Sequence, residues 1–151
     1  MKQRIDYQQV ASGAFRAMLN LEKYVRECGL EHSLLELIKT RASQINGCAY
    51  CIDMHTKDAR AAGETEQRLY GLSAWHETPF YTERERAALE LTEAVTRISE
   101  GGVPGELYER VRQHFNEEEL VNVVTTIIAI NGWNRLALSF GTVAGSYQPP
   151  A

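Results

Sequence analysis

The sequence predicts an all-α protein, a compact single-domain bundle of about six to seven helices. Three observations predict this class: apolar residues recur at helical spacing, capping sequences precede several apolar runs, and no pair of strand-like segments is present. The chain has 151 residues, of which 44% are hydrophobic and 24% are charged. These are ordinary values for a globular protein, and the length leaves no room for a second independent core. We expect one domain over residues 1–151.

The first two expected helices cover residues 6–28 and the segment that follows. Apolar side chains share one face of residues 6–28, and Gly29 ends the pattern. Ser33 is expected to cap the second helix, with Glu36 three residues later as its capping-box partner. Asn46-Gly47 is a typical helix end.

Two further helices and a loop are expected before the middle of the chain. One helix is expected over residues 48–62 and a short one over 65–73, followed by a loop at 76–79. Residues 82–85, Thr-Glu-Arg-Glu, match a capping box that opens a helix over residues 82–98.

The last third of the chain is expected to hold two helices. Gly101, Gly102 and Pro104 interrupt the chain, and a helix is expected over residues 104–113. Asn116 and Glu119 resemble another capping box, which predicts a long helix over residues 117–140. The β-branched run 123–128 lies inside this helix and is expected to be helical, because a capping sequence precedes it and no partner strand exists.

Charge and hydropathy exclude several function classes. The net charge is −4 and the isoelectric point is about 5.6, which argues against a nucleic-acid partner. The first nine residues are too polar for a signal peptide, and the longest apolar-rich stretch, 120–130, is too short to span a bilayer. We therefore expect no membrane association and a cytoplasmic location, where a CxxC pair is more often catalytic or metal-binding than structural.

Cys48, Cys51 and His55 form the group of residues that can carry chemistry. Their spacings of three and four place them within an arc of roughly 60° on one helix face. Two cysteines one helical turn apart can form a disulfide, and the free N–H groups of a first turn favour a thiolate. A thiolate can attack a peroxide to give a sulfenic acid, which a second thiol converts to a disulfide that an external dithiol resets. His55 can exchange a proton with either sulfur.

These residues resemble the AhpD-like alkylhydroperoxidase family, within the carboxymuconolactone decarboxylase superfamily. The family pattern has a glutamate twelve positions before a CxxC motif and a histidine four positions after its second cysteine, and Glu36, Cys48, Cys51 and His55 match it. The resemblance covers roughly residues 15–140. It extends through Arg41-Ala42-Ser43-Gln44-Ile45-Asn46-Gly47, Asp58-Ala59-Arg60, Gly63-Glu64, Arg68-Leu69, Ala74-Trp75, Glu85-Arg86-Ala87-Ala88-Leu89 and Asn131-Gly132-Trp133-Asn134-Arg135.

The resemblance implies a role for each matched residue. Cys51 would be the peroxidatic cysteine, Cys48 the resolving cysteine, and His55 a proton relay completed by Glu36, with no metal or organic cofactor. It also implies a homo-oligomer, a trimer or hexamer with the cysteines near subunit interfaces. The substrate would be an organic hydroperoxide or hydrogen peroxide, and the reductant an external dithiol such as a lipoyl-bearing or thioredoxin-like protein. The residues alone leave the order of the sulfurs open, because the helix end favours Cys48 as the more acidic thiol.

One position departs from the family pattern. The best-known members, which pair with a lipoyl-bearing adaptor, resemble Cys-Ser-His-Cys at the motif, whereas this chain has Tyr50 in place of that histidine. A second proton-handling group is therefore missing from the motif, and we expect either a weaker peroxidase activity or a different reductant.

Four alternatives remain open at the level of the sequence, three for the protein's function and one for Glu36. Cys48, Cys51 and His55 could bind zinc with Cys28 or His32 as a fourth ligand, although three ligands along one helix face converge poorly on a tetrahedral ion. The protein could be a redox-sensing module without turnover, or a decarboxylase or lactone-processing enzyme of the same superfamily, in which two thiols have no task. Glu36 could be a solvated residue, since its catalytic role requires that the cysteine helix or another subunit cover its face.

Overall fold

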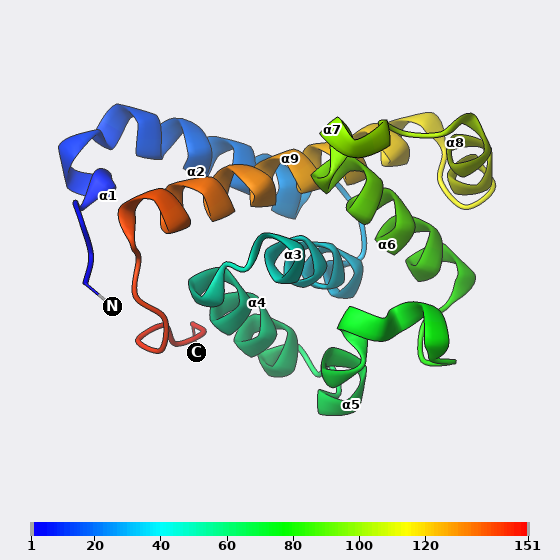
Figure 1. Cartoon of the computed structure of the whole chain (residues 1–151), viewed down its shortest axis with the longest axis horizontal. Helices are drawn as coiled ribbons and strands as arrows, with labels where there is room; N and C mark the ends of the chain where they lie inside the picture. Colours follow the sequence, from blue (N-terminus) through cyan, green and yellow to red (C-terminus); the bar gives the residue numbers. More distant parts are fainter. Residues whose placement is uncertain (1, 151) are drawn as a thin grey trace.

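The structure, a computed structural model, describes residues 2–150 and confirms the all-α class (Figure 1). Within these residues the chain forms ten helical segments and no strand, against the six to seven helices expected. The additional segments are short pieces where expected helices break or expected loops coil. The six longer helices are α2 (Ser12–Glu27), α3 (His32–Asn46), α4 (Ala49–Ala61), α6 (Glu83–Thr96), α8 (Gly105–Arg112) and α9 (Glu117–Phe140). The short ones are α1 (Tyr7–Val10), α5 (Glu66–Tyr70), the 3₁₀ helix η1 (Leu72–Glu77) and α7 (Ile98–Gly101).

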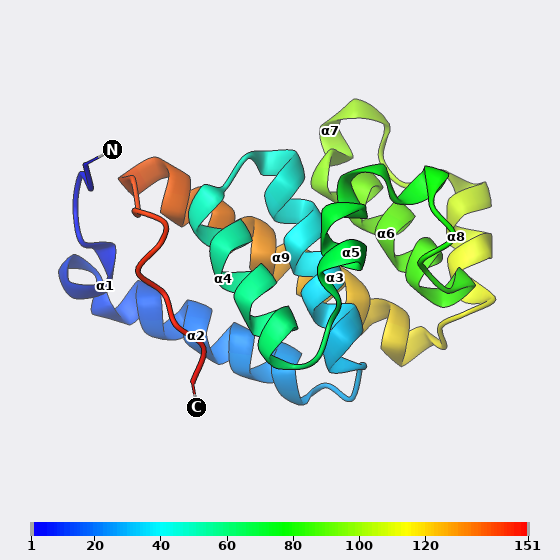
Figure 2. The same cartoon turned by 90° about the horizontal axis from the view of Figure 1, so that it is seen from below.

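Helix α3 lies at the centre of the fold. It packs against α4, α6 and α9, while α2 runs alongside α9 (Figures 1 and 2). The main apolar core joins side chains from α2, α3, α6, α8 and α9. Residues 34–40 of α3 are therefore buried without a break, and polar side chains on this helix are buried together with the apolar ones. Among residues 2–150, no helix has the length and apolar character needed to cross a bilayer.

Two expected capping boxes are present. The Asn116 side chain accepts from the Glu119 N–H at 2.9 Å, and the Glu119 carboxylate accepts from the Asn116 N–H at 2.9 Å. Thr82 and Glu85 make the same reciprocal pair at the start of α6. Each box satisfies N–H groups that have no partner inside the helix, so both helices begin where the sequence predicts. The β-branched run in α9 is helical, as expected.

The single helix expected over residues 6–28 is broken. The backbone of Ala11 leaves the helical region, with φ −131° and ψ 60°, and separates α1 from α2. Tyr7 packs on Phe140 and Phe15, with ring centroids 5.6 Å and 6.2 Å away. This docking of an aromatic side chain onto the end of α9 redirects the chain, a tertiary effect that helical spacing does not reveal.

The capping box expected at Ser33 and Glu36 is also wrong. Helix α3 begins at His32 with Glu31 at the N-cap position, and no side chain caps it. Glu36 turns to His55 instead. A buried imidazole competes successfully with a local backbone N–H for this carboxylate, because a buried charge must be paired.

The segment around Trp75 differs from the expected loop at 76–79. Trp75 is buried and donates its Nε1–H to Glu93 at 2.8 Å. Anchoring this side chain coils the backbone into η1, which reaches into the expected loop. The helix expected to end at residue 98 stops at Thr96, and α7 follows it as a separate turn.

Candidate active site

A two-residue joint, Gly47 and Cys48, connects α3 to α4 and positions the first cysteine. Gly47 adopts a left-handed conformation, with φ 69° and ψ 29°, as its place in Asn46-Gly47 predicts. Its N–H donates to the Gln44 carbonyl at 3.2 Å, and the Cys48 N–H donates to the Ser43 carbonyl at 3.0 Å. This is the Schellman arrangement, which favours glycine. Because α4 starts directly after it, Cys48 becomes the N-cap residue of α4.

The two cysteines of the CxxC motif are buried and in contact with each other. Cys48 and Cys51 are 1% and 4% exposed, and Cys48 Sγ accepts from the Cys51 backbone N–H at 3.4 Å. A hydrogen bond from the Cys51 thiol, opposed by burial and assisted by backbone N–H groups, lowers the pKa of Cys48 to about 7. The same hydrogen bond and burial raise the pKa of Cys51. Cys48 is thus the more acidic sulfur, as its place at the helix end suggests.

A cavity of about 230 Å³ exposes the second cysteine and not the first. Cys51 and His55 are part of its wall, whereas Cys48 is not. The acidic sulfur and the sulfur that a small molecule can reach are therefore different atoms. The remaining wall is mostly aromatic and apolar and consists of Tyr7, Gln8, Phe15, Leu19, Glu22, Arg26, Tyr50, Met54, Trp133, Ala137 and Tyr147.

Glu36 and His55 form a buried pair beside the thiols. His55 Nδ1 lies 2.9 Å from Glu36 Oε2, and the residues are 6% and 4% exposed. Helix α4 itself covers the face of α3 that carries Glu36, which meets the condition for its proposed role. Burial acts to raise the pKa of Glu36, but the hydrogen bond and charge of His55 outweigh it and lower this pKa. An ionised Glu36 holds the proton on Nδ1, which leaves Nε2 as the nitrogen for proton exchange.

The sequence analysis missed a second buried ion pair at the cavity. Lys39 is 1% exposed and donates to the carboxylate of Glu22, which is part of the cavity wall. Glu22 also accepts the Nε1–H of Trp133 at 3.3 Å. Burial acts to raise the pKa of Glu22, but the charge and hydrogen bond of Lys39 lower it. The position of Lys39, one turn after Glu36 on α3, could have indicated that it lies near the site. Its partner Glu22 could not be identified in this way, because Glu22 lies on α2.

Helix α9 contributes an amide network on the other side of the thiols. Asn134 is fully buried, donates to Ser43 Oγ at 3.0 Å and accepts from Asn46 Nδ2 at 2.9 Å. A hydrogen bond from Asn134 lowers the pKa of both cysteines, although it is a minor cause for each. This network fixes the helix ends around the motif.

The zinc site considered from the sequence is not assembled. Within residues 2–150, the side chains that bring three possible ligand atoms within 4.8 Å of one another are Glu36, His55 and Asp58. The two cysteines do not form such a group with His55 and either Cys28 or His32. One oxygen of each carboxylate already has a partner: Glu36 Oε2 pairs with His55, and Asp58 Oδ1 accepts from the Tyr147 hydroxyl at 2.7 Å.

The fold and the site define a class: a helical protein with a buried CxxC dithiol beside a carboxylate–histidine pair. A model of the carboxymuconolactone decarboxylase family matches residues 12–94. The chain belongs to this family, which confirms the resemblance found in the sequence.

Named relatives agree with this assignment. The uncharacterized protein YdfG of Bacillus subtilis (strain 168) is 50% identical over 146 residues, which cover 97% of this chain and 99% of YdfG. The crystal structure of ATU0492 from Agrobacterium tumefaciens, a protein of unknown function whose name links it to AhpD antioxidant defence, is 47% identical. It matches with a TM-score of 0.94 over 97% of this chain and 100% of that chain.

A more distant structure shares the fold alone. The alkylhydroperoxidase AhpD core of an uncharacterized peroxidase-related protein from Ralstonia eutropha JMP134 is 21% identical and gives a TM-score of 0.81. The match covers 92% of this chain and 74% of that chain. The bundle described above is thus AhpD-like.

Proposed function

We propose that this protein is a thiol-dependent hydroperoxide reductase that uses the Cys48–Cys51 pair with the His55–Glu36 pair as its proton relay. One observation carries the proposal: Cys51 and His55 border the same small cavity, while Cys48 lies in hydrogen-bond contact with Cys51. A nucleophile, a proton donor and a resolving thiol are the three groups that this reaction requires.

The proposed reaction begins at the sulfur that the substrate can reach. As Cys51 Sγ attacks the terminal peroxide oxygen, its proton passes to the Cys48 thiolate, since the two sulfurs already share a hydrogen bond. The O–O bond breaks, His55 gives the leaving alkoxide the proton that Cys48 released on ionising, and Cys51 becomes a sulfenic acid. Cys48 then attacks the sulfenic sulfur, which releases water and forms the disulfide. One hydroperoxide and two thiols thus give one alcohol, one water and one disulfide.

The proposed substrate is an organic hydroperoxide or hydrogen peroxide, and an external dithiol restores the two thiols by exchange. The aromatic and apolar cavity wall supports an organic substituent on the peroxide. A cytoplasmic setting, in which both thiols are regenerated, fits this cycle. Tyr50 lies in the cavity wall where the best-known relatives have a histidine, so His55 acts without a second motif histidine.

A peroxide-consumption assay with a dithiol reductant tests the proposal on wild type, Cys48→Ser, Cys51→Ser and His55→Ala. We expect turnover to be lost in both cysteine variants, and a stable sulfenic acid in Cys48→Ser but not in Cys51→Ser. Cys28→Ser is the matched control, because Cys28 is half-buried and lies outside the cavity. Continued turnover in both motif variants would refute the proposal. A wild-type protein that forms the disulfide once but does not turn over would instead be a redox sensor.

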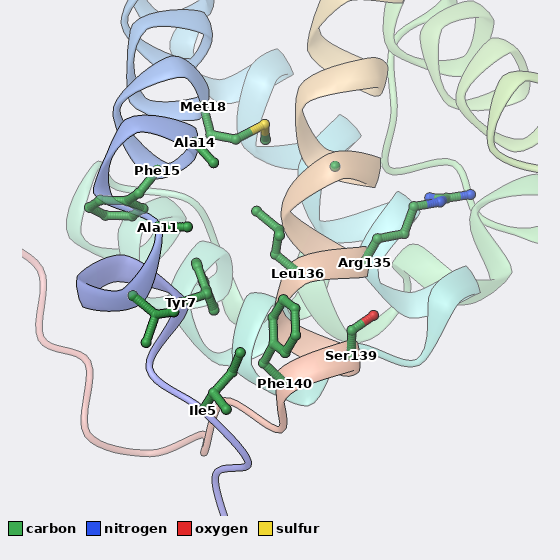
Figure 3. Close-up of a pocket in the computed structure, with 12 residues that line it drawn as sticks. Ile5, Tyr7, Ala11, Ala14, Phe15, Met18, Arg135, Leu136, Ser139 and Phe140 are labelled. Atoms are coloured by element: carbon green, nitrogen blue, oxygen red, sulfur yellow. The ribbon is translucent and has the colours of Figure 1, made fainter.

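We also propose that the protein is a homo-oligomer, built through the exposed face of α9. An apolar groove of about 550 Å³ lies between α2 and α9, with Met18, Leu136 and Phe140 pointing into the space between them (Figure 3). Farther along α9, Ile128 is 54% exposed, and an apolar face of this extent supports a subunit contact. Light scattering on wild type and Ile128→Lys tests the contact. A monomeric wild type would overturn it, whereas a lower mass for the variant supports it.

A further inference from the structure

The C-terminal segment returns along α4 after α9 ends. Residues 142–150 contain no helix, and the red trace in Figure 2 passes α4 and crosses α2. Most of these residues are exposed, so few apolar contacts hold the segment in place. The Thr142 N–H still donates to the Ala137 carbonyl of α9 at 2.9 Å. Beyond it, hydrogen bonds to α4 run from Gly145 N–H to Asp53 at 3.1 Å, from Lys57 Nζ to the Tyr147 carbonyl at 2.9 Å, and from the Tyr147 hydroxyl to Asp58 at 2.7 Å.

Tyr147 connects this segment to the thiol cavity. Its side chain is part of the same wall as Cys51 and His55. Burial and the hydrogen bond to Asp58 raise the pKa of Tyr147 to about 12, so the phenol remains a donor at neutral pH. Asp58 in turn has an oxygen within 4.8 Å of the ligand atoms of Glu36 and His55. The attachment point of the segment is therefore adjacent to the proton relay.

The two steps of the catalytic cycle place different demands on this wall. A small hydroperoxide fits a cavity of about 230 Å³. Re-reduction needs more room, since a partner thiolate must approach one sulfur of the disulfide along the S–S axis. Cys48 and Cys51 are 1% and 4% exposed, so a dithiol carried on a protein surface cannot reach either sulfur while the wall is closed.

We propose that Tyr147 is a specificity-determining residue: its hydrogen bond to Asp58 closes the cavity to all but small molecules, and the C-terminal segment must detach before a macromolecular dithiol can reach the Cys48–Cys51 disulfide. This inference rests on the proposed function. In the exchange, one partner thiolate breaks the S–S bond and forms a mixed disulfide, which the second partner thiol resolves. The partner supplies two electrons and two protons and becomes a disulfide, and both cysteines regain their thiols.

A size-dependent labelling experiment on the reduced full-length protein tests the proposal without any peroxidase assay. Iodoacetamide serves as the small probe and a polyethylene-glycol maleimide as the bulky one, with labelling of each cysteine followed by mass spectrometry. Cys28 is half-buried and outside the cavity, so its labelling rate provides an internal reference for each reagent. Tyr147→Phe keeps the ring in the wall and removes the hydroxyl. We expect it to raise bulky-probe labelling of Cys51 about tenfold, the effect of one hydrogen bond to a charged group, with little change for iodoacetamide.

Tyr24→Phe is the matched control. It removes a hydroxyl that donates to Asn122 at 2.8 Å, at a position that is not part of the cavity wall. We expect wild-type labelling of Cys51 with both probes. Lys57→Met removes the bond to the Tyr147 carbonyl and provides a second, independent test, with a smaller increase for the bulky probe.

The outcomes separate this inference from the proposed function. Equal ratios of bulky to small labelling in wild type, Tyr147→Phe and Lys57→Met would overturn the role of Tyr147, whatever the peroxidase activity. If the ratio rises as expected but the wild type consumes no hydroperoxide, the closed cavity stands and the proposed function fails. If both hold, Tyr147→Phe should also accelerate disulfide reduction by a thioredoxin-type protein while reduction by dithiothreitol stays unchanged.

Discussion

Two clusters of charged side chains in this molecule look alike but are built from different groups. At the thiol cavity, Lys39 pairs with Glu22, and Glu36 pairs with His55. At the contact between α5 and α6, Arg68 binds Glu64 at 2.9 Å and Glu85 at 2.6 Å, and its guanidinium lies 5.0 Å from the ring centroid of Tyr81. Both clusters are largely shielded from water.

The two clusters differ in the pKa of the groups at their centres. Burial of Arg68 acts to lower its pKa, but hydrogen bonds to Glu85 and Glu64 raise it, so this cation stays charged under all ordinary conditions. The cavity cluster instead contains an imidazole and adjoins a thiol, Cys48, whose pKa is lowered to about 7. A charge network that only supports the fold can be built around an arginine that stays charged, whereas this site adjoins a thiol whose pKa lies near neutral pH.

Breaking the buried pair at the cavity should have the largest effect on stability. Lys39→Met removes the buried cation of Glu22 and leaves the mostly exposed Arg26, at 3.4 Å, as its remaining charged partner, and we expect a loss of about 3 kcal/mol in the free energy of unfolding. Chemical denaturation measures this value. Lys39→Met combined with Glu22→Gln should recover much of the loss, since no uncompensated charge remains. A single-variant loss below about 1 kcal/mol would mean that the pair is not buried as described.

Removing the charge of Glu36 should lower the catalytic activity, whereas the same change at the second cluster should not. Glu36→Gln keeps an acceptor for His55 but removes the carboxylate that stabilises a protonated imidazole. We expect kcat/KM for hydroperoxide to fall about a hundredfold, a typical contribution of acid–base catalysis. Glu85→Gln is the matched control at the second cluster. It should lower stability by about 1 kcal/mol and leave kcat/KM unchanged. Similar losses of activity in the two variants would remove the distinction between the clusters.

The ionisation of the dithiol should depend on its internal hydrogen bond. The thiolate absorbance of the reduced protein should appear as the pH rises through about 7, the pKa of Cys48. Below that pH both thiols are protonated, and the stability that Cys48 contributes through its lowered pKa is lost as the pH falls through it. In Cys51→Ala the donor is missing, so the midpoint should move up toward the ordinary cysteine value of about 8.5. An unchanged midpoint would assign the lowering to the helix end instead.

The smallest effect is expected at the second cluster. Arg68→Lys keeps the charge but loses the planar guanidinium that reaches Glu64 through Nε and Glu85 through Nη2, and we expect a loss of about 1 kcal/mol. Thermal unfolding measures the loss, and the peroxide assay should give the wild-type rate. A drop in that rate would indicate that the two clusters are coupled through α3 and α6.

The parts of the fold that the sequence predicts correctly depend on local contacts. The capping boxes at Thr82 and Asn116 involve residues three apart, and the structure confirms both. The box at Ser33 is wrong because Glu36 finds a buried partner 19 residues away. The helix break at Ala11 depends on Phe140, which is at the far end of the chain.

In the candidate site, too, the residues that are close in the sequence are predictable and those from distant segments are not. Glu36, Cys48, Cys51 and His55 belong to one helical hairpin, so their spacing alone indicates that they meet. The cavity wall does not follow from any local pattern. Trp133 and Tyr147 come from distant segments, and the bond between Trp133 and Glu22 spans 111 residues.

The two-residue joint of Gly47 and Cys48 has a consequence for how this protein can diverge. Because this joint is so short, all four proposed reactive residues belong to one continuous segment, residues 32–61, which holds α3 and α4. Most of the cavity wall comes from elsewhere: α1, α2, α9 and the C-terminal segment. Substitutions in those outer elements can alter which molecules enter without disturbing the geometry of the reaction. Chemistry and selectivity are therefore separately variable, and an engineer could redesign one while leaving the other intact.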